Sequence, residues 1–255
     1  MIALTHRPLL LLAVSFVVLW LSAWVGAVGF KRLKSHIAEL HDDFNVVQGG
    51  TLTLLGLIIG FTFSMALTRY DQRKNYEEEE ANAIGTEYVR ADLLPQADAA
   101  KVRALLVSYL EQRILFYTTR DEDELQQINV RTAELQNEMW SAVQVPATAQ
   151  PTPVMALAVS GMNDVLNSQG YTQAAWLNRI PVGAWALMAA IAVSSTILVG
   201  VAAHSVREGR GLLVILPFVI SIAFFLIADI DAPRRGIIRV IPQNLELLLQ
   251  SLRPS

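Results

Sequence analysis

The residues whose types and spacing best suit a function lie on one uncharged stretch, Gly49 to Thr68. Five hydroxyl or apolar side chains recur there at spacings of 4, 4, 3 and 4 residues: Thr53, Leu57, Phe61, Ser64 and Thr68. On a helix this spacing places them on one face. Such a face suits a narrow pore with hydrophobic constrictions, and it equally suits an ordinary contact between helices. The spacing alone leaves both interpretations open.

Beside this row, Gly56 and Gly60 form a G-x-x-x-G pattern. Small residues four apart let membrane helices approach closely, so we predict helix packing at these two positions. If the helix continues past Thr68, then Asp71, Asn75 and Glu78 extend the same face outside the membrane. In a symmetric oligomer they would form rings at a pore mouth that concentrate cations, and the alternative is a solvated charged face.

Enzyme chemistry has little support in the sequence. The G-x-S-x-G, H-E-x-x-H, P-loop and G-x-G-x-x-G motifs are missing, and the chain has no Cys. His36, Glu39, His41, Asp42 and Asp43 match no known ligand spacing, so a solvated loop is the preferred interpretation. We therefore expect no enzyme activity, no metal site and no cofactor. A net charge of −3 gives no reason to expect a nucleic-acid partner.

The elements that carry these residues are membrane helices. Of the 255 residues, 53% are hydrophobic and only 17% are charged, a membrane composition with a polar part. Four apolar segments are long enough to span a bilayer: Leu9–Phe30, Gly50–Thr68, Ile180–Ala203 and Gly211–Ile230. The second continues without a break into charged sequence, which predicts one helix from Gly49 to about Arg90. The predicted fold is all-α, with four transmembrane helices and a cytoplasmic helical extension.

The domain prediction follows from these segments. Residues 1–69 hold transmembrane helices 1 and 2, residues 70–178 form a cytoplasmic helical region with a linker at 145–153, residues 179–231 hold helices 3 and 4, and residues 232–255 form a cytoplasmic C-terminal segment. In the polar region, one apolar stripe comprises Val102, Leu105, Leu106, Tyr109 and Leu110, and a second comprises Leu125, Ile128, Leu135 and Met139 around Thr132. A further helix is predicted from Val154 to Asn167, ending near Gly170.

Orientation follows from the Lys and Arg residues near the span ends. The side that holds both termini carries Arg7, Arg69, Arg73, Lys74, Arg179, Arg234, Arg235 and Arg239. The other side carries Lys31, Arg32, Lys34, Arg207 and Arg210. The larger set predicts cytoplasmic termini in a multi-pass protein of a bacterial inner (plasma) membrane.

Several motifs resemble those of a known family. G-F-T-F-S-M-A-L-T-R-Y at Gly60–Tyr70 is similar to the second transmembrane helix of bestrophins. Met162-Asn163 followed by W-L-N-R-I-P at Trp176–Pro181 is similar to the segment that enters their third span. The whole chain, including E-E-A-N-A-I-G-T-E-Y-V-R-A-D-L-L-P and I-A-D-I-D-A-P-R-R-G, resembles more closely a bacterial bestrophin-like membrane protein family of unassigned function.

Bestrophins are oligomeric ion channels, typically pentamers, with four spans per subunit, cytosolic termini and a neck lined by the second helix. Anchored on the Gly-Phe pair, the resemblance implies neck residues Thr53, Leu57 and Phe61 here. Phe61 is identical, Leu57 replaces an aromatic residue and Thr53 replaces an apolar one. The acidic run of the family's calcium clasp is missing after Asp229 and Asp231, so calcium activation is not implied.

The resemblance therefore implies a homo-oligomeric channel, with the lipid bilayer and small inorganic ions as its other partners. It leaves the sign of the permeant ion open, because members of the family differ in that property. The alternative function is a non-conducting membrane scaffold or sensor whose cytoplasmic helices bind a partner.

Overall fold

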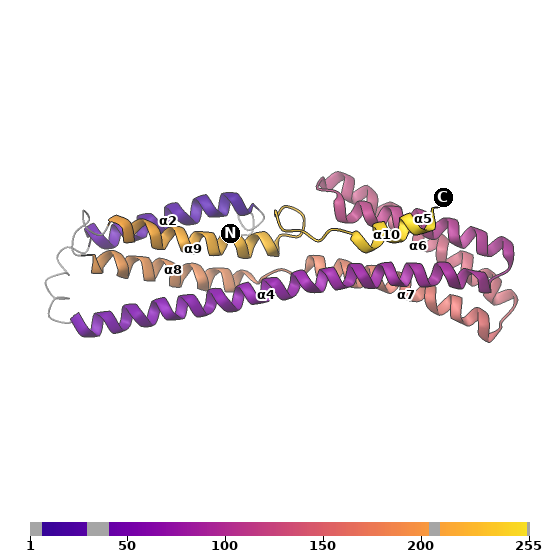
Figure 1. Cartoon of the computed structure of the whole chain (residues 1–255), viewed down its shortest axis with the longest axis horizontal. Helices are drawn as coiled ribbons and strands as arrows, with labels where there is room; N and C mark the ends of the chain where they lie inside the picture. Colours follow the sequence, from indigo (N-terminus) through magenta and orange to yellow (C-terminus); the bar gives the residue numbers. More distant parts are fainter. Residues whose placement is uncertain (1–6, 30–40, 204–209, 254–255) are drawn as a thin grey trace. The chain divides into compact units, whose positions relative to one another are not determined.

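The computed structural model describes residues 7–29, 41–203 and 210–253, and every regular element in these ranges is a helix (Figure 1). The elements are α2 (Pro8–Gly29), α4 (His41–Arg90), the 3₁₀ turn η1 (Ala91–Leu93), α5 (Gln96–Thr118), α6 (Glu122–Ala149), α7 (Pro153–Leu177), α8 (Val182–Ala202), α9 (Arg210–Asp231) and α10 (Gln243–Leu252). The all-α prediction is confirmed. The predicted basic residues Lys31, Arg32, Lys34 and Arg207, with His36 and Glu39, lie outside the described ranges.

The chain forms two compact units. The membrane unit takes its described residues from Met1–Thr68 and Arg179–Ile238, and the helical unit takes its described residues from Arg69–Asn178 and Arg239–Ser255. Helix α4 contributes its apolar first part to the membrane unit and its charged second part to the helical unit. One helix therefore carries both halves of the sequence stripe.

Four helices are long and apolar enough to cross a bilayer: α2, the first part of α4, α8 and α9. Their bounds lie within two residues of the predicted spans, except at the start of α4. Helix α8 begins at Val182 because Pro181 occupies its N-cap. The prediction of four transmembrane helices is confirmed by length and composition.

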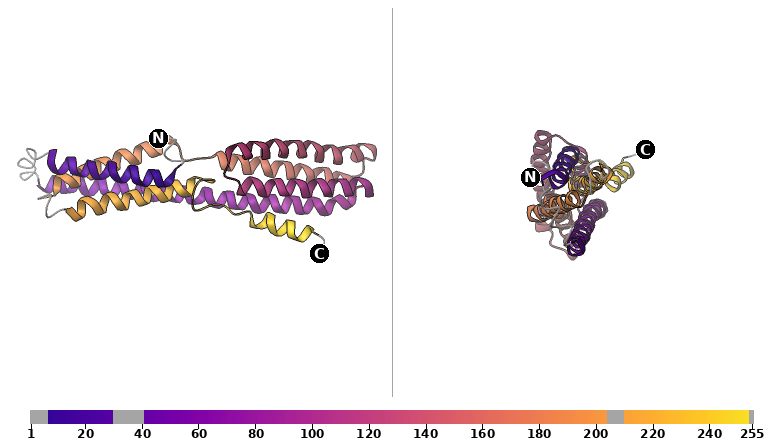
Figure 2. Two further views of the ribbon diagram at one scale, coloured as in Figure 1. Left: turned by 90° about the horizontal axis from the view of Figure 1, so that it is seen from above. Right: turned by 90° about the vertical axis from the view of Figure 1, so that its left-hand side faces the viewer.

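The membrane unit is held by a close crossing of α2 and α8. A Cβ atom on Gly26 would overlap the backbone carbonyl of Ile197, and one on Gly200 would overlap the carbonyl of Ala23. Each glycine therefore admits the backbone of the other helix. Helix α9 packs beside α2 (Figure 2). The rings of Phe16 and Phe218 meet there edge to face, at 6.1 Å between centroids.

Helix α4 begins eight residues earlier than predicted, at His41 instead of Gly49. Residues 41–48 contain neither Gly nor Pro, and acidic residues near a helix N-terminus interact favourably with its dipole. The segment predicted to be part of a solvated loop is therefore helical from His41 onward.

The core of the helical unit lies between α4, α5, α6 and α7. Both predicted apolar stripes face it: Val102, Leu106, Tyr109 and Leu110 are buried from α5, and Ile128, Thr132, Leu135 and Met139 are buried from α6. Helix α6 starts after an N-cap aspartate: the Asp121 carboxylate accepts hydrogen bonds from the backbone N–H groups of Asp123 and Glu124, both at 2.9 Å.

Two helix ends in this unit differ from prediction. Helix α6 runs through the predicted 145–153 linker to Ala149, with Pro146 inside it, so the connection to α7 is only residues 150–152. Helix α7 continues past Gly170 to Leu177. In both cases tertiary burial outweighs a local helix breaker, since Pro146 is buried, as are Thr172 and Trp176 beyond Gly170.

The C-terminal segment contains a helix that the sequence analysis missed. In α10, Leu245 is fully buried, and Leu248, Leu249 and Leu252 pack against the same core. Their spacing of 3, 4 and 7 residues from Leu245 is the helical signal that could have found it. The Glu77 carboxylate of α4 accepts hydrogen bonds from the backbone N–H groups of Asn244 and Leu245, at 2.9 and 3.0 Å, and so caps this helix.

Candidate pore-lining face

The predicted neck residues lie on an exposed face of α4. Phe61 is 65% exposed, Leu57 is 52% exposed and Thr53 is also exposed. The opposite face of the same helix is buried in the membrane unit, at Leu55, Thr62 and Ala66. Within the described parts of the chain, the neck side chains are therefore accessible on the outer face of α4, where a pore or a second copy can reach them.

The exposed face presents hydrogen-bond acceptors among apolar side chains. The hydroxyl groups of Thr53 and Thr68 donate to the carbonyl oxygens of Gly49 and Ser64, each at 2.9 Å. Because each hydrogen is used within the helix, each hydroxyl oxygen presents lone pairs outward. The face thus offers weak acceptors interrupted by the apolar Leu57 and Phe61.

The same face continues along the charged part of α4. Asp71, Asn75 and Glu78 are all exposed, as is Asn82 one turn further. The buried face of this part carries Arg73, Glu77, Glu80 and Glu87 instead. The predicted mouth residues are therefore exposed on α4 within the helical unit, as the neck residues are exposed on α4 within the membrane unit.

Gly56 and Gly60 are exposed as well. A Cβ atom at either position would meet no other described atom within 4 Å, whereas Gly26 and Gly200 are tightly enclosed. The predicted packing at Gly56 and Gly60 thus concerns a contact with a second copy and stays a prediction. The enclosed pair was missed, although small residues four apart, Ala23/Ala27 and Thr196/Gly200, signal it in the sequence.

Two buried carboxylates hold the end of α9. Asp231 accepts hydrogen bonds from the backbone N–H of Ile180 at 3.2 Å and from Nε of Arg179 at 3.3 Å. Asp229 accepts from the backbone N–H groups of Ile237 and Ile238, both at 2.8 Å. Asp231 thus stabilises the segment before α8, and Asp229 stabilises the loop after α9. We therefore assign both carboxylates a structural role.

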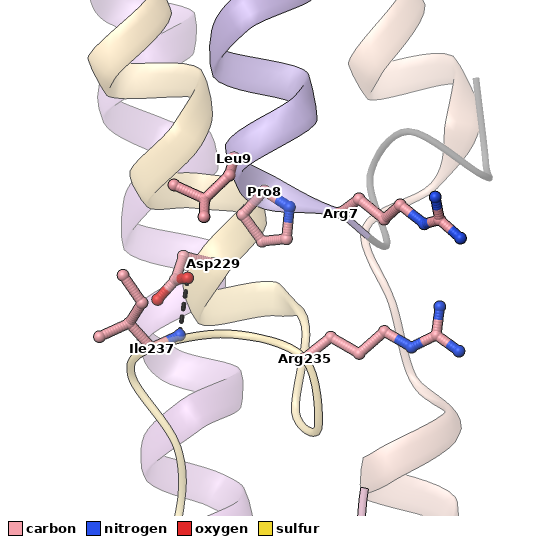
Figure 3. A pocket seen from close by; sticks show the side chains of 6 residues that line it. All are labelled: Arg7, Pro8, Leu9, Asp229, Arg235 and Ile237. Carbon is pink, nitrogen blue, oxygen red and sulfur yellow. Dashed lines mark hydrogen bonds between the residues drawn. The ribbon is translucent and has the colours of Figure 1, made fainter. Parts of the chain in front are cut away.

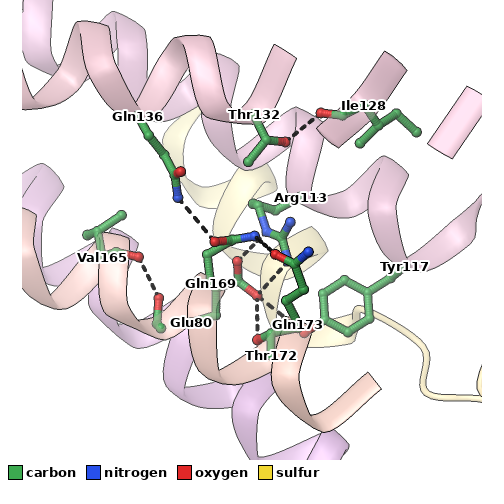
Figure 4. Close-up of polar contacts among 11 residues, drawn as sticks. Glu80, Arg113, Tyr117, Ile128, Thr132, Gln136, Val165, Gln169, Thr172 and Gln173 are labelled. Atoms are coloured by element: carbon green, nitrogen blue, oxygen red, sulfur yellow. Dashed lines mark hydrogen bonds and ion pairs between the residues drawn. The ribbon is translucent and has the colours of Figure 1, made fainter. Parts of the chain in front are cut away.

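The charged part of α4 is anchored by a buried ion pair that sequence reasoning did not find (Figure 4). Glu80 and Arg113 of α5 are both fully buried and form an ion pair through Nε. Glu80 Oε2 also accepts hydrogen bonds from the hydroxyl groups of Tyr117 at 3.2 Å and Thr172 at 3.1 Å. Side chains of α5 and α7 thus converge on one carboxylate of α4.

The surroundings of Arg113 favour its charged form. Burial alone would lower the pKa of Arg113, but the adjacent Glu80 carboxylate raises it above its ordinary value. The Arg113 guanidinium also stacks over the Phe116 ring at 4.3 Å from the centroid. Burial, followed by the Glu80 charge, raises the pKa of Tyr117, which keeps its hydroxyl protonated as a donor.

Two turns further along α4, Glu87 lies in a niche beside Gly161 of α7. Its side chain is fully buried, and neither carboxylate oxygen has a hydrogen-bond partner in the described parts of the chain. A Cβ atom on Gly161 would overlap this carboxylate. Burial raises the pKa of Glu87 to about 8, the Arg90 charge lowers it and the Asp164 charge raises it again.

We expect this niche to make the helical unit less stable as the pH rises. Between the ordinary pKa of 4.5 and about 8, the unfolded chain loses the Glu87 proton while the folded chain keeps it, so the free energy of unfolding falls. Glu87→Gln should remove this dependence and raise Tm at pH values near 8 by about 5 °C. Thermal unfolding across this range tests it, with exposed Glu79→Gln as the control, and an unchanged pH slope in Glu87→Gln would contradict it.

The fold and the exposed face define a four-span, all-helical membrane protein. A family model of the bestrophin-like domain matches residues 11–245. The chain therefore belongs to the bestrophin-like family. No curated protein matches it.

Solved structures of a bacterial bestrophin homologue from Klebsiella pneumoniae share the fold. One mutant of that homologue superposes with a TM-score of 0.64 at 12% identity, over 94% of this chain and 93% of that chain. A second crystal structure of it, phased by Zn-SAD, gives a TM-score of 0.64 at 11% identity, over 94% and 95% of the two chains. The recognition of the family from Gly60–Tyr70 and the other motifs is confirmed.

Proposed function

We propose that the protein is a bestrophin-like, homo-oligomeric ion channel that conducts small ions passively through a central pore lined by α4. The observation that carries the proposal is the exposed stripe from Thr53 to Asn82 on one face of α4, opposite a buried face. A helix exposed in this way within its own subunit suits a position around a shared axis. Membership of the bestrophin-like family supports the same conclusion.

In this proposal Leu57 and Phe61 form the hydrophobic constriction, and Thr53 supplies a polar ring beside it. Gly56 and Gly60 let neighbouring copies of α4 approach closely, which keeps the pore narrow. Asp71, Asn75 and Glu78 form the mouth, where rings of carboxylates concentrate cations. The assembly is a pentamer, as the resemblance to bestrophins implies.

The orientation in this proposal places both termini and the helical unit in the cytoplasm of a bacterial cell, with the spans in the inner membrane. The Lys and Arg residues near the span ends support it, because Arg7, Arg69, Arg179 and Arg235 all fall on the same side. No enzyme activity is part of the proposal.

The neck is tested by shortening its aromatic side chain. In a planar bilayer, Phe61→Ala should raise the single-channel conductance at least about twofold, because it widens and hydrates the constriction. Phe63→Ala is the matched control, since Phe63 lies two residues along α4 and so points to a different face. Equal currents from the native protein and from Phe61→Ala would remove Phe61 from the constriction.

A further inference from the structure

The membrane unit contains a pocket where α2 begins and α9 has just ended (Figure 3). It has a volume of about 230 Å³ and is lined by Arg7, Pro8, Leu9, Asp229, Arg235 and Ile237. Pro8 is the first residue of α2, and α9 ends at Asp231, so both arginines lie just beyond membrane-spanning helices. The pocket is therefore at the level of the bilayer surface.

The pocket is positively charged on one side. The Arg7 and Arg235 side chains are exposed and extend in the same direction, one from the residue before α2 and the other from the loop after α9. The Asp229 carboxylate points the other way and accepts hydrogen bonds from the backbone N–H groups of Ile237 and Ile238. Its oxygen atoms are thus occupied by backbone donors, and the first turn of α2 adds the positive end of a helix dipole.

The rest of the lining is apolar and faces outward. Leu9 is 67% exposed and Ile237 is 73% exposed, beside the two guanidinium groups. A small soluble anion gains nothing from contact with these exposed apolar side chains. A phospholipid, in contrast, carries its phosphate next to glycerol and acyl chains that can pack against them. Arg binds phosphate oxygens through two parallel N–H donors, and basic pockets at the ends of spans suit anionic headgroups.

From this arrangement we propose that Arg7 and Arg235 bind the phosphate of an anionic phospholipid in the adjacent leaflet, with its acyl chains against Leu9 and Ile237. The bound lipid ties the start of α2 to the loop after α9. The site is separate from the exposed face of α4 and does not depend on ion conduction.

The full-length protein in neutral detergent can be titrated calorimetrically with dioctanoyl phosphatidylglycerol, dioctanoyl phosphatidylcholine and inorganic phosphate. Phosphatidylglycerol should bind at least about tenfold more tightly than either other probe. Arg7→Gln/Arg235→Gln should weaken its binding about tenfold, and each single variant about threefold. Lys101→Gln/Arg120→Gln, which removes two exposed charges from the helical unit, should bind phosphatidylglycerol like the native protein.

The single variants keep the test decisive if the double variant does not fold. Unchanged phosphatidylglycerol affinity in the Arg7 and Arg235 variants, or equal affinity for the two lipids, would overturn the proposal. Inorganic phosphate that displaces phosphatidylglycerol at equal concentration would assign the pocket to a free anion and contradict the lipid proposal.

Discussion

Glu80→Ala should lower the stability of the helical unit by about 3–5 kcal/mol, because it leaves the Arg113 guanidinium charged and unpaired in the core. Both side chains of the pair are fully buried, so water cannot replace the lost carboxylate. Tyr117 and Thr172 lose an acceptor in the same change. In a domain of this size, the loss corresponds to a fall in Tm of about 10 °C.

Thermal unfolding of the detergent-solubilised protein, followed by circular dichroism, measures this effect. Glu79→Ala is the matched control, because Glu79 precedes Glu80 on α4 but is exposed, and we expect no change from it beyond about 0.5 kcal/mol. Glu80→Leu/Arg113→Met removes both charges together and should recover part of the loss. Equal stability of Glu80→Ala and Glu79→Ala would show that the pair does not anchor α4.

Gly200→Val should lower the stability of the membrane unit by about 3 kcal/mol, because a side chain there meets the backbone of α2 at Ala23. Helix backbones cannot yield as a flexible side chain can, so α2 and α8 must separate along the crossing. The loss should appear in thermal unfolding of the protein in detergent. Gly26→Val should act in the same way from the other helix.

Gly183→Val is the control for this change, since it lies on the same helix and its Cβ would meet no described atom within 4 Å. Gly60→Val separates packing within a subunit from packing between subunits. It should leave the stability of one subunit unchanged and weaken the oligomer, as native mass measurement would show. A stable Gly200→Val protein, or a Gly60→Val protein with an intact oligomer, would contradict the respective assignment.

The sequence predicted those parts of the fold that depend on local physics. Span length and apolar composition located all four membrane helices, and periodicity located the buried faces of α5 and α6. Local breakers were misleading at Pro146 and Gly170, where burial in the core keeps the helices continuous. The start of α4 was placed eight residues too late, and α10 was missed although the spacing of its leucines indicates a helix.

In the candidate site, too, local features were predicted from the sequence and long-range contacts were not. Side-chain spacing predicted that Thr53, Leu57 and Phe61 share a face, and the structure shows that face exposed. The partners of Glu80 lie 33 and 92 residues away in the chain, at Arg113 and Thr172, so only the tertiary fold brings them together. The same holds for the glycines: sequence could not tell the exposed Gly60 from the enclosed Gly200.

Ion flux into liposomes that contain the purified, native protein tests the central claim most directly. The account predicts flux above that of protein-free vesicles, from a homo-oligomer whose mass is measured in the same preparation, and a further increase for Phe61→Ala but not for Phe63→Ala. Flux equal to that of empty vesicles, from a protein that native mass measurement shows to be a monomer, would contradict the channel and favour the non-conducting scaffold or sensor.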